Sequence, residues 1–389
     1  MTGTDDIIRP GDAVALTAAL VRVDSRNPSL VPGGPGERAA ALRLAAALRG
    51  WGFRVELQEA APGRPNVVAR AGRARAGAPT LMFNGHLDVV GVDGMTHAPF
   101  AAERRGDRLY GRGAADMKAG VAAMCAAAWR AAQAGIDGEV VVAAVVDEEF
   151  ESLGTRALVE SGVRADAAVV TEPTRLAINP AHRGFAWAEV LVRGRAAHGS
   201  RYDLGVDAIR HAGLLLAELD DVDARLLPAR THPLLGRASL HASGISGGTG
   251  WSTYPDQCTV RIERRTLPGE TMADAVREIE AACERVRARR PTFDASVTLS
   301  GGQGPSDVPV DAPLCRALGA ALAARGEATT VEGMSAWTDA ALLNDAGIPA
   351  VCFGPGDIRL AHAAEEWVEV SEIERAAGVL EELARAWCG

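Results

Sequence analysis

Histidine and carboxylate side chains follow four of the apolar runs in this chain. The groups that follow the runs are His86 and Asp88 after 81–83, Asp147, Glu148 and Glu149 after 139–146, Glu172 after 165–170, and His362 after 348–353. A further carboxylate, Asp116, lies in the glycine-containing segment 111–118. Clustered carboxylates repel one another unless a cation compensates them. The set is large enough for a two-metal site, whose ions lie about 3.5–4 Å apart and activate water to attack a carbonyl group.

Each of these groups also has an ordinary structural interpretation when it is taken alone. A histidine two residues before an aspartate is usually a surface pair, Glu172 before a proline is typical of a turn, and His362 is compatible with a buried structural histidine. Alternate residues of an extended segment point the same way, so Asp88 can orient a metal-bound His86. The metal interpretation therefore depends on these groups occurring together.

The elements that must position these groups follow an α/β pattern in the first half of the chain. Apolar runs at 53–57, 81–83, 139–146 and 165–170 are separated by alanine- and leucine-rich helical stretches that include 37–50 and 119–134. Strands separated by helices at this spacing predict βαβ units and a mostly parallel sheet covered by helices. In such a sheet ligands bind beyond the carboxyl ends of the strands, so the histidines and carboxylates are expected at one edge.

The pattern changes after about residue 176 and resumes at about residue 302. The intervening segments are strand-like at 186–192, 257–265 and 293–299 and helical at 206–219 and 271–289, and the later ones are helical at 312–325 and 338–346. Alternation of apolar and polar residues predicts antiparallel strands with one solvated face. We therefore predict a catalytic α/β domain over 1–176 and 302–389, interrupted by an α+β domain over 177–301.

Composition and charge narrow the class of protein. The 389 residues are 48% hydrophobic and carry a formal net charge of −9, which favours a globular chain and argues against a nucleic-acid partner. No apolar run approaches the roughly 20 residues of a membrane span, and the first ten residues, with Asp5 and Asp6, do not resemble a signal peptide. The six cysteines form no CxxC pair, which argues against a zinc-thiolate site and favours a reduced, cytoplasmic protein.

The basic residues of the chain are almost all arginines. Forty of the 41 are arginine, and the remaining one is Lys118. A GC-rich genome accounts for the arginines but not for the lysine, which lies two residues after Asp116. Its position suggests a local role beside the predicted site.

Several longer motifs occur in a fixed order along nearly the whole chain. They are GHLDVV (85–90), LYGRGAADMKAG (109–120), DEEFESLGT (147–155), TEPT (171–174), HRG (182–184), GRAAHGS (194–200), RRTLPGE (264–270) and, within 354–370, GPG and AHAAEEWVEV. In these motifs the sequence resembles the M20 metallopeptidase and amidohydrolase family, which includes acetylornithine deacetylase, succinyl-diaminopimelate desuccinylase and aminoacylase. Because several independent motifs agree, the resemblance does not depend on any single one.

The resemblance implies a role for each of the clustered residues. His86 would bind one metal ion with Glu172, His362 would bind the other with Glu149, and Asp116 would bridge both. Glu148 would be the general base, and Asp88 would support His86. Zinc is the default metal for mixed histidine and carboxylate ligands, with cobalt and manganese as alternatives.

The inserted domain resembles the family's lid, which implies a homodimer formed through that domain. His198 matches the lid histidine that stabilises the tetrahedral oxyanion, often from the partner subunit, and Arg264 and Arg265 match the lid arginines, one of which can clamp a substrate carboxylate. The predicted substrate-binding residues are Arg264, Arg265, Ser252, Gly354 and Gly356. The sequence departs from the family at Gly199, where serine is frequent, and at Ser252, which replaces a substrate-holding asparagine and so leaves the substrate open.

The expected function is a dinuclear metal-dependent amidohydrolase that removes an acyl group from an N-acyl amino acid or a similar small amide, in the manner of acetylornithine deacetylase. The segment 336–339, Ala-Trp-Thr-Asp, replaces the Gly-Thr-Ser-Asp of the desuccinylase branch. The alternatives are a dipeptidase or carboxypeptidase on the same site, an amidohydrolase of specialised metabolism, and a binding protein that retains the fold. The acyl group, the amine and the native metal stay open.

Overall fold

The fold is described from a computed structural model over residues 8–389. The expectation for the signal peptide falls largely on residues 1–7, which lie outside the described residues. The chain divides into two compact units, the first made of the described residues up to Pro180 with Val308–Glu332 and Thr338–Gly389, and the second of Ala181–Asp307 and Gly333–Trp337. The expected division fell at 176/177 and 301/302, and the grouping of 333–337 with the second unit was not anticipated.

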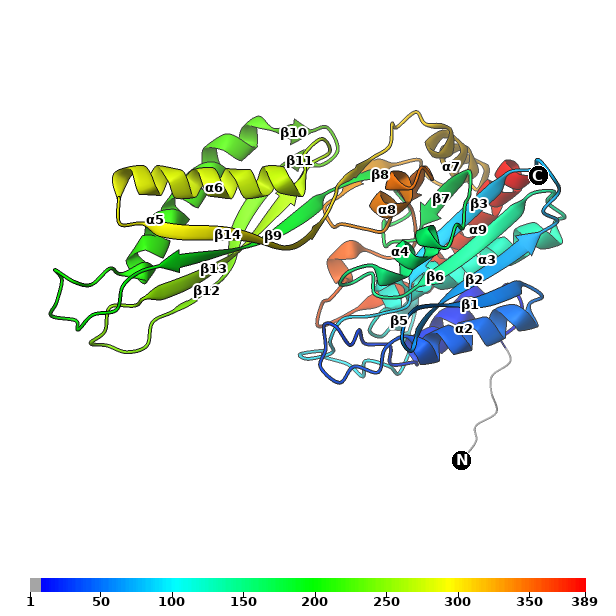
Figure 1. The fold of residues 1–389 in the computed structure, drawn as a ribbon. Coiled ribbons are helices and arrows are strands. Elements are labelled where there is room, and N and C mark those ends of the chain that lie inside the picture. The colour runs from blue at the N-terminus through cyan, green and yellow to red at the C-terminus, as the bar shows by residue number, and fades with distance from the viewer. Residues whose placement is uncertain (1–7) are drawn as a thin grey trace. The chain divides into compact units, whose positions relative to one another are not determined.

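A single sheet forms the centre of the first unit (Figure 1). Its main strands are β1 (Arg54–Ala61), β2 (Arg64–Gly72), β3 (Thr80–His86), β6 (Glu139–Val145), β7 (Ala167–Val170), β8 (Ile178–His182) and β17 (Ala350–Cys352), in the order β1-β2-β6-β3-β7-β17-β8. The four central strands β6, β3, β7 and β17 are parallel, whereas the pairs on either side are antiparallel. The short strands β15 (Ser306–Asp307) and β16 (Val331–Met334) pair with β8.

Helices cover both faces of this sheet. They are α1 (Ala13–Val21), α2 (Arg38–Gly50), α3 (Ala119–Gln133), α4 (Leu153–Glu160), α7 (Pro313–Ala324), α8 (Ala340–Asp345) and α9 (Val370–Cys388). Adjacent residues of β3 face opposite layers: the Asn84 amide donates to Thr155 of α4, whereas a Cβ added to Gly85 would lie 3.1 Å from Val121 of α3. The α/β architecture expected from the sequence is therefore confirmed, with parallel strands at the centre of the sheet, whereas the antiparallel pairs on either side were not expected.

Smaller elements complete the first unit. A three-stranded sheet contains β4 (Glu103–Arg105), β5 (Arg108–Tyr110) and β18 (Trp367–Glu369), and two short helical segments are η1 (Ala114–Lys118) and η4 (Ile358–Leu360). The hairpin partner β2 and this small sheet were not predicted from the sequence.

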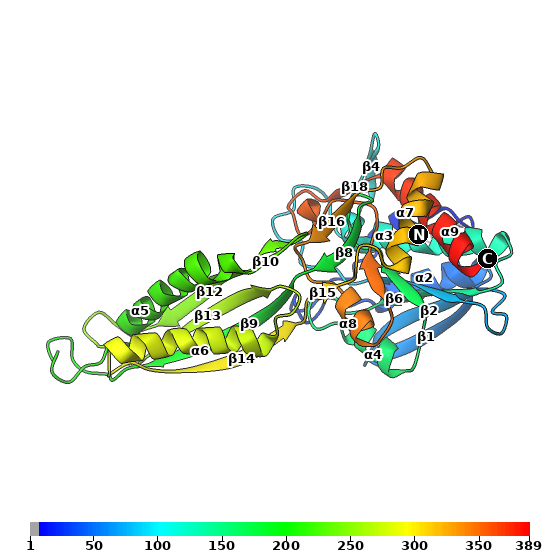
Figure 2. The ribbon, with the colours of Figure 1, turned by 90° about the horizontal axis from the view of Figure 1, so that it is seen from above.

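The second unit is an antiparallel sheet with two helices on one face (Figures 1 and 2). Its strands run in the order β12 (Ser239–Gly247), β13 (Gln257–Thr266), β9 (Gly184–Arg193) and β14 (Asp294–Gln303), and its helices are α5 (Ala208–Asp221) and α6 (Met272–Arg289). Alternate residues of β9, such as Val190 and Val192, join the core beneath the helices. Two segments, η2 (Val222–Leu226) and η3 (Leu227–Ala229), lead to the short hairpin β10 (Thr231–His232) and β11 (Gly236–Arg237).

Side-chain caps fix where the two helices of the second unit begin. The Asp207 carboxylate accepts the backbone N–H of Arg210, and Thr271 forms a reciprocal capping box with Asp274. Each cap satisfies backbone donors that the first helical turn leaves unpaired. The predicted helices 206–219 and 271–289 therefore begin one or two residues later, after their caps.

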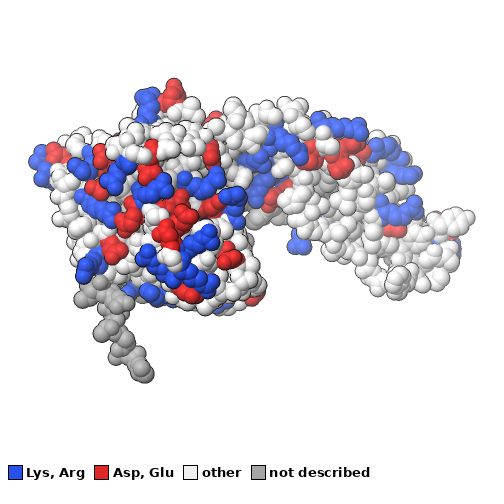
Figure 3. Space-filling model, turned by 180° about the vertical axis from the view of Figure 1, so that it is seen from behind, with Lys and Arg blue, Asp and Glu red and all other residues white. Residues whose placement is uncertain are grey.

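The surface carries arginines next to carboxylates over much of the face seen in Figure 3. Arg375 pairs with Glu327, and Arg73 and Arg75 share Asp137. Within residues 8–389, no helix combines the length and apolar character that a bilayer crossing requires.

Candidate metal centre

The predicted ligands lie at the carboxyl ends of three neighbouring parallel strands. His86 is the last residue of β3, Glu148 and Glu149 follow β6, and Glu172 follows β7. Because β3 pairs with β6 on one side and with β7 on the other, these ends meet at one edge of the sheet. Asp116 reaches the same edge from η1, which precedes α3.

The Asp116 carboxylate lies between the two histidines. Its Oδ1 is 3.1 Å from His86 Nε2, and its Oδ2 is 3.6 Å from His362 Nε2. His362 Nε2 is also 2.9 Å from Glu149 Oε2. One carboxylate therefore faces one imidazole with each oxygen, which is the arrangement that a ligand shared between two ions requires.

Two groups of side chains could each hold a metal ion. The ligand atoms of His86, Glu148 and Glu172 lie within 4.8 Å of one another, and so do those of His86, Asp116 and Glu149. The side chains of Asp116 and Glu149 are only 9% and 8% exposed, whereas that of His362 is 52% exposed. The cluster is therefore a mostly buried set of oxygen and nitrogen donors.

The electrostatics of the cluster fit bound cations. Burial raises the pKa values of Glu148, Glu149 and Glu172, and repulsion between neighbouring carboxylates raises them further. Burial lowers the pKa of His362, but its hydrogen bond with Glu149 and the negative charges of Glu149 and Asp116 together outweigh burial and raise the pKa to about 9. A divalent cation would remove the repulsion that these shifts express, so the residues fit a metal site.

The loop that carries Asp116 is held by a buried glutamate. Glu366 Oε1 accepts the backbone N–H groups of Ala115 and Asp116 at 3.0 and 3.1 Å, and Glu366 Oε2 accepts from Arg112 at 2.7 Å. Burial raises the pKa of Glu366 to about 7. Glu366 belongs to the motif at 361–370, and its support of the Asp116 loop becomes visible only in the fold.

A family model and named relatives show the family to which the chain belongs. The model of the peptidase family M20/M25/M40 matches residues 82–386. This chain belongs to that family. It is 31% identical to an acetylornithine deacetylase of Myxococcus xanthus over 96% of this chain and 97% of the relative, and 28% identical to an N-formyl-4-amino-5-aminomethyl-2-methylpyrimidine deformylase of Bacillus subtilis over 89% and 88%.

A solved structure supports the fold of this M20 family member. A dinuclear metal-binding M20 peptidase of Bacillus subtilis superposes with a TM-score of 0.75 at 18% identity, and the match covers 97% of each chain. The expectations of M20 membership and of a hydrolase acting on amide bonds are confirmed.

Asp88 supports the centre of this M20 chain more broadly than expected. Its backbone oxygen is 3.0 Å from His86 Nδ1, whereas its nearest carboxylate oxygen is 3.6 Å away. The carboxylate instead accepts the backbone N–H groups of Glu148 and Glu149, each at 3.2 Å. Asp88 therefore connects His86 to the turn that carries the two glutamates.

Lys118 proves to be an internal anchor. It is fully buried, and its Nζ donates to the backbone oxygen of Val23 at 2.9 Å. The aliphatic part of the Lys118 side chain packs against Gly113, where an added Cβ would lie 3.1 Å from Lys118 Cδ. Gly113 also has a φ of 80°. Burial lowers the pKa of Lys118 to about 8.

Three of the predicted residues in the second unit lie on its strands or loops with accessible side chains. His198 is exposed, with Nδ1 2.8 Å from Ser200 Oγ, and the Ser252 backbone oxygen accepts the N–H of Gly199 at 2.7 Å. A Cβ at Gly199 would lie 3.3 Å from the Ser252 backbone. Arg265 pairs with Glu263 at 2.6 Å, and its side chain is 31% exposed. The structure thus brings His198 and Ser252 onto adjacent loops.

Arg264 is a correction to the predicted substrate contacts. Its side chain is 1% exposed, and Nη2 and Nε lie 2.9 Å from Glu270 and Glu278 respectively. Because its hydrogen bonds are directed to these carboxylates and to the Arg265 backbone oxygen, it joins β13 to α6 rather than facing a substrate. Its position beside Arg265 in the sequence concealed this difference, since successive residues of a strand face opposite ways.

Replacing Arg264 by methionine is expected to destabilise the protein by about 1–3 kcal/mol, because Glu270 and Glu278 lose one of the two arginines with which they pair, the other being Arg230. Urea unfolding measures this change. The control is Arg261→Met at an exposed position of the same strand, where a change within about 0.5 kcal/mol is expected. Equal stability of the two variants would contradict the structural role of Arg264.

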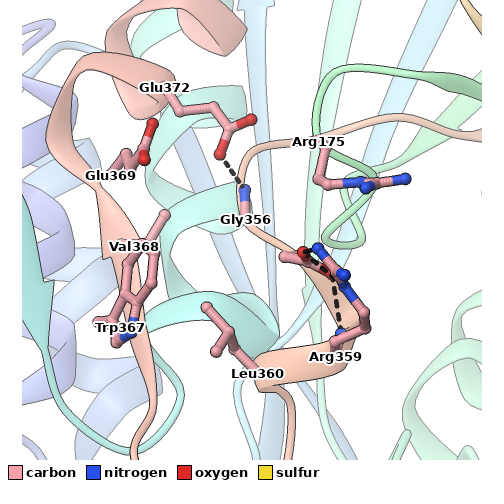
Figure 4. Close-up of a pocket in the computed structure, with 9 residues that line it drawn as sticks. Arg175, Gly356, Arg359, Leu360, Trp367, Val368, Glu369 and Glu372 are labelled. Carbon is pink, nitrogen blue, oxygen red and sulfur yellow. Dashed lines mark hydrogen bonds and ion pairs between the residues drawn. The ribbon is translucent and has the colours of Figure 1, made fainter.

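The two predicted glycines shape the backbone beside Glu172. A Cβ at Gly354 would lie 2.5 and 2.6 Å from the backbone oxygens of Thr171 and Glu172, so only glycine fits there. Gly356 has a φ of 94°, and its N–H donates to Glu372 at 2.9 Å. Gly356 also borders a cavity of about 450 Å³ between η4 and the start of α9, lined by Arg175, Arg359, Leu360 and Trp367 among others (Figure 4).

Sequence reasoning missed a second buried carboxyl group near the glutamates. Asp339 Oδ2 accepts from Thr155 at 2.6 Å, and Thr155 in turn accepts from Asn84. Burial raises the pKa of Asp339 to about 6. In the sequence Asp339 was noted only as the last residue of the segment 336–339, and its contact with Thr155 of α4 depends on the fold.

Proposed function

We propose that this chain hydrolyses the amide bond of an N-acyl amino acid or similar small N-acyl amine, as an acetylornithine-deacetylase-like enzyme. The observation that carries the proposal is the Asp116 carboxylate between His86 and His362, with glutamates on the neighbouring strand ends. The names of the relatives at 31% and 28% identity, a deacetylase and a deformylase, support removal of a small acyl group from an amine.

His86, Asp116 and Glu172 would hold one divalent ion, and His362, Asp116 and Glu149 the other. When bound, two such ions supply Lewis acidity that activates water and polarises the substrate carbonyl. The donor set fits zinc, with cobalt and manganese as alternatives.

Glu148 acts as the proton carrier of the proposed reaction. Its side chain is 10% exposed and its Oε2 lies 4.0 Å from His86 Nε2, which places it beside the ligands. The carboxylate takes a proton from the attacking water and delivers it to the amine nitrogen as the C–N bond breaks. In the metal-loaded protein Glu148 would be ionised before the first transfer, because opposite charge nearby lowers a carboxyl pKa.

Residues of the second unit complete the proposal. His198 would stabilise the oxyanion, supplied by a partner subunit, and Arg265 would bind the substrate carboxylate with Ser252 nearby. Ser252 stands where the family often has asparagine, so the acyl group and amine are to be found by experiment.

A screen tests the proposed substrate class. The metal-loaded protein is assayed against N-acetyl, N-formyl and N-succinyl amino acids and against dipeptides. Turnover of N-acyl amino acids supports the proposal. Hydrolysis of dipeptides alone would overturn the proposal in favour of a dipeptidase.

A homodimer through the second unit is part of the proposal. Exposed apolar side chains on this unit support it: Trp251 is 106% exposed, Tyr202 85% and Ile245 54%. Light scattering after gel filtration should give about twice the 40.5 kDa chain mass, and Ile245→Lys on the edge strand β12 should shift the protein to monomer. A wild-type mass of one chain would contradict the dimer.

We also propose a cytoplasmic location. The six cysteines are all free and buried, which is compatible with a reducing compartment.

A further inference from the structure

A buried ionic network reaches the turn that carries Glu148 and Glu149. It begins at Glu37, which precedes α2, is fully buried and pairs with Arg64 at the start of β2. Arg64 Nη2 lies 2.8 Å from Asp147 Oδ1 and donates to Asn27 Oδ1 at 3.2 Å. These residues come from segments far apart in the sequence, which is why no motif pointed to them.

The network continues from Asn27 to the metal centre. Asn27 Nδ2 donates to Asp88 Oδ2 at 2.8 Å and to Asp147 Oδ1 at 3.0 Å. Asp88 in turn accepts the backbone N–H groups of Glu148 and Glu149. The chain of contacts therefore runs from Arg64 to the backbone of both glutamates.

The turn at Asp147 is a conformation that needs support. Asp147 has a φ of 67°, a region that residues other than glycine adopt rarely. Its N–H donates to Glu37 at 3.3 Å, and its carboxylate is fully buried. The contacts with Glu37, Arg64 and Asn27 hold the backbone in this conformation.

Arg64 is suited to this position by its geometry as well as its charge. Its Nε donates to Glu37 at 2.9 Å and its Nη1 to Ser29 at 3.3 Å, while Nη2 faces Asp147 and Asn27. A lysine has its three donors on a single nitrogen, which cannot reach all the partners that the three separate guanidinium nitrogens contact. Three carboxylates are buried here. Those of Glu37 and Asp147 pair with the Arg64 guanidinium, and that of Asp88 accepts from the Asn27 side-chain amide, which in turn accepts from Arg64.

We infer that Arg64 is a positioning residue, which through Asp147, Asn27 and Asp88 holds Glu148 and Glu149 at the geometry that proton transfer and metal binding need. The inference rests on the proposed function. It predicts that substitution of Arg64, which is not among the proposed metal- or substrate-binding residues, lowers both kcat and metal affinity.

The test compares Arg64→Lys with Arg70→Lys. Arg70 lies on the same strand, and its Nη1 pairs with Glu139 Oε2 at 2.6 Å, so it is a matched loss of an arginine ion pair outside the network. We expect Arg64→Lys to lower kcat and metal affinity by about 10–100-fold, with KM changed less than about threefold. Arg70→Lys should leave all three near wild type.

Two further measurements make the test decisive. Asn27→Ser removes the amide link but no charge, and it is expected to lower metal affinity in the same direction even if Arg64→Lys does not fold. Metal affinity is measured by calorimetric titration, so it reports on the turn even if the screen finds no amide substrate and the proposed function fails. Wild-type metal affinity and kcat in a folded Arg64→Lys or Asn27→Ser protein would overturn the inference.

Discussion

Replacing Glu148 by glutamine is expected to lower the kcat for amide hydrolysis by about 10²–10⁴-fold. The variant should stay folded and bind metal. The amide has nearly the shape of the carboxylate but cannot take a proton from water or return it to the amine. Steady-state kinetics with the best N-acyl substrate, together with metal quantification, measure both effects.

The matched control is Glu151→Gln, three residues further along the same loop at an exposed position. This variant should keep wild-type kcat, since its side chain lies on the surface. Full activity in Glu148→Gln would contradict the role of Glu148 as the proton carrier. Unchanged biological function despite lost hydrolysis would instead favour a binding protein that retains the fold.

Removal of metal by a chelator is expected to abolish activity and to lower thermal stability. A ligand present at 100 times its Kd stabilises the folded state by about 2.7 kcal/mol, so the unfolding midpoint should fall on chelation and recover on adding zinc, cobalt or manganese. Differential scanning fluorimetry and activity assays follow both changes, and the metal that restores the highest kcat identifies the preferred ion.

The metal affinity should also rise with pH. In the metal-free protein the pKa of His362 is raised to about 9, so this imidazole holds a proton that a metal ion must displace. Because fewer protons are displaced at higher pH, binding should tighten as pH rises toward 9. Equal activity of the chelated and the metal-loaded protein would contradict the metal centre. A metal affinity independent of pH would contradict the displacement of a proton from His362.

The sequence predicted the elements that carry the chemistry better than those that frame them. The runs that became β3, β6 and β7 are continuous and apolar because helices cover both faces, and each ends at a polar group, so strand and site could be predicted together. The strand β12 was missed because its sequence, SLHASGISG, is rich in serine and glycine, and its place at the sheet edge requires little apolar burial.

The same distinction applies to the individual residues. The ligands lie in motifs with family counterparts, whereas the supporting roles of Arg64, Asn27 and Glu366 depend on contacts across 37 to 254 residues of sequence. Arg264 was misplaced for a related reason, because the motif RRTLPGE does not show which of two adjacent arginines faces Glu270 and Glu278. Such assignments depend on tertiary contacts that a single sequence does not contain.

Lys118 has a consequence for the chemical labelling of this protein. It carries the only ε-amino group in the chain, and that group is buried against Val23. Amine-reactive reagents therefore have no exposed lysine to modify in the native state. Modification of Lys118 would occur only when the segment beside Asp116 opens. The modification rate would therefore measure how often this segment opens by local unfolding.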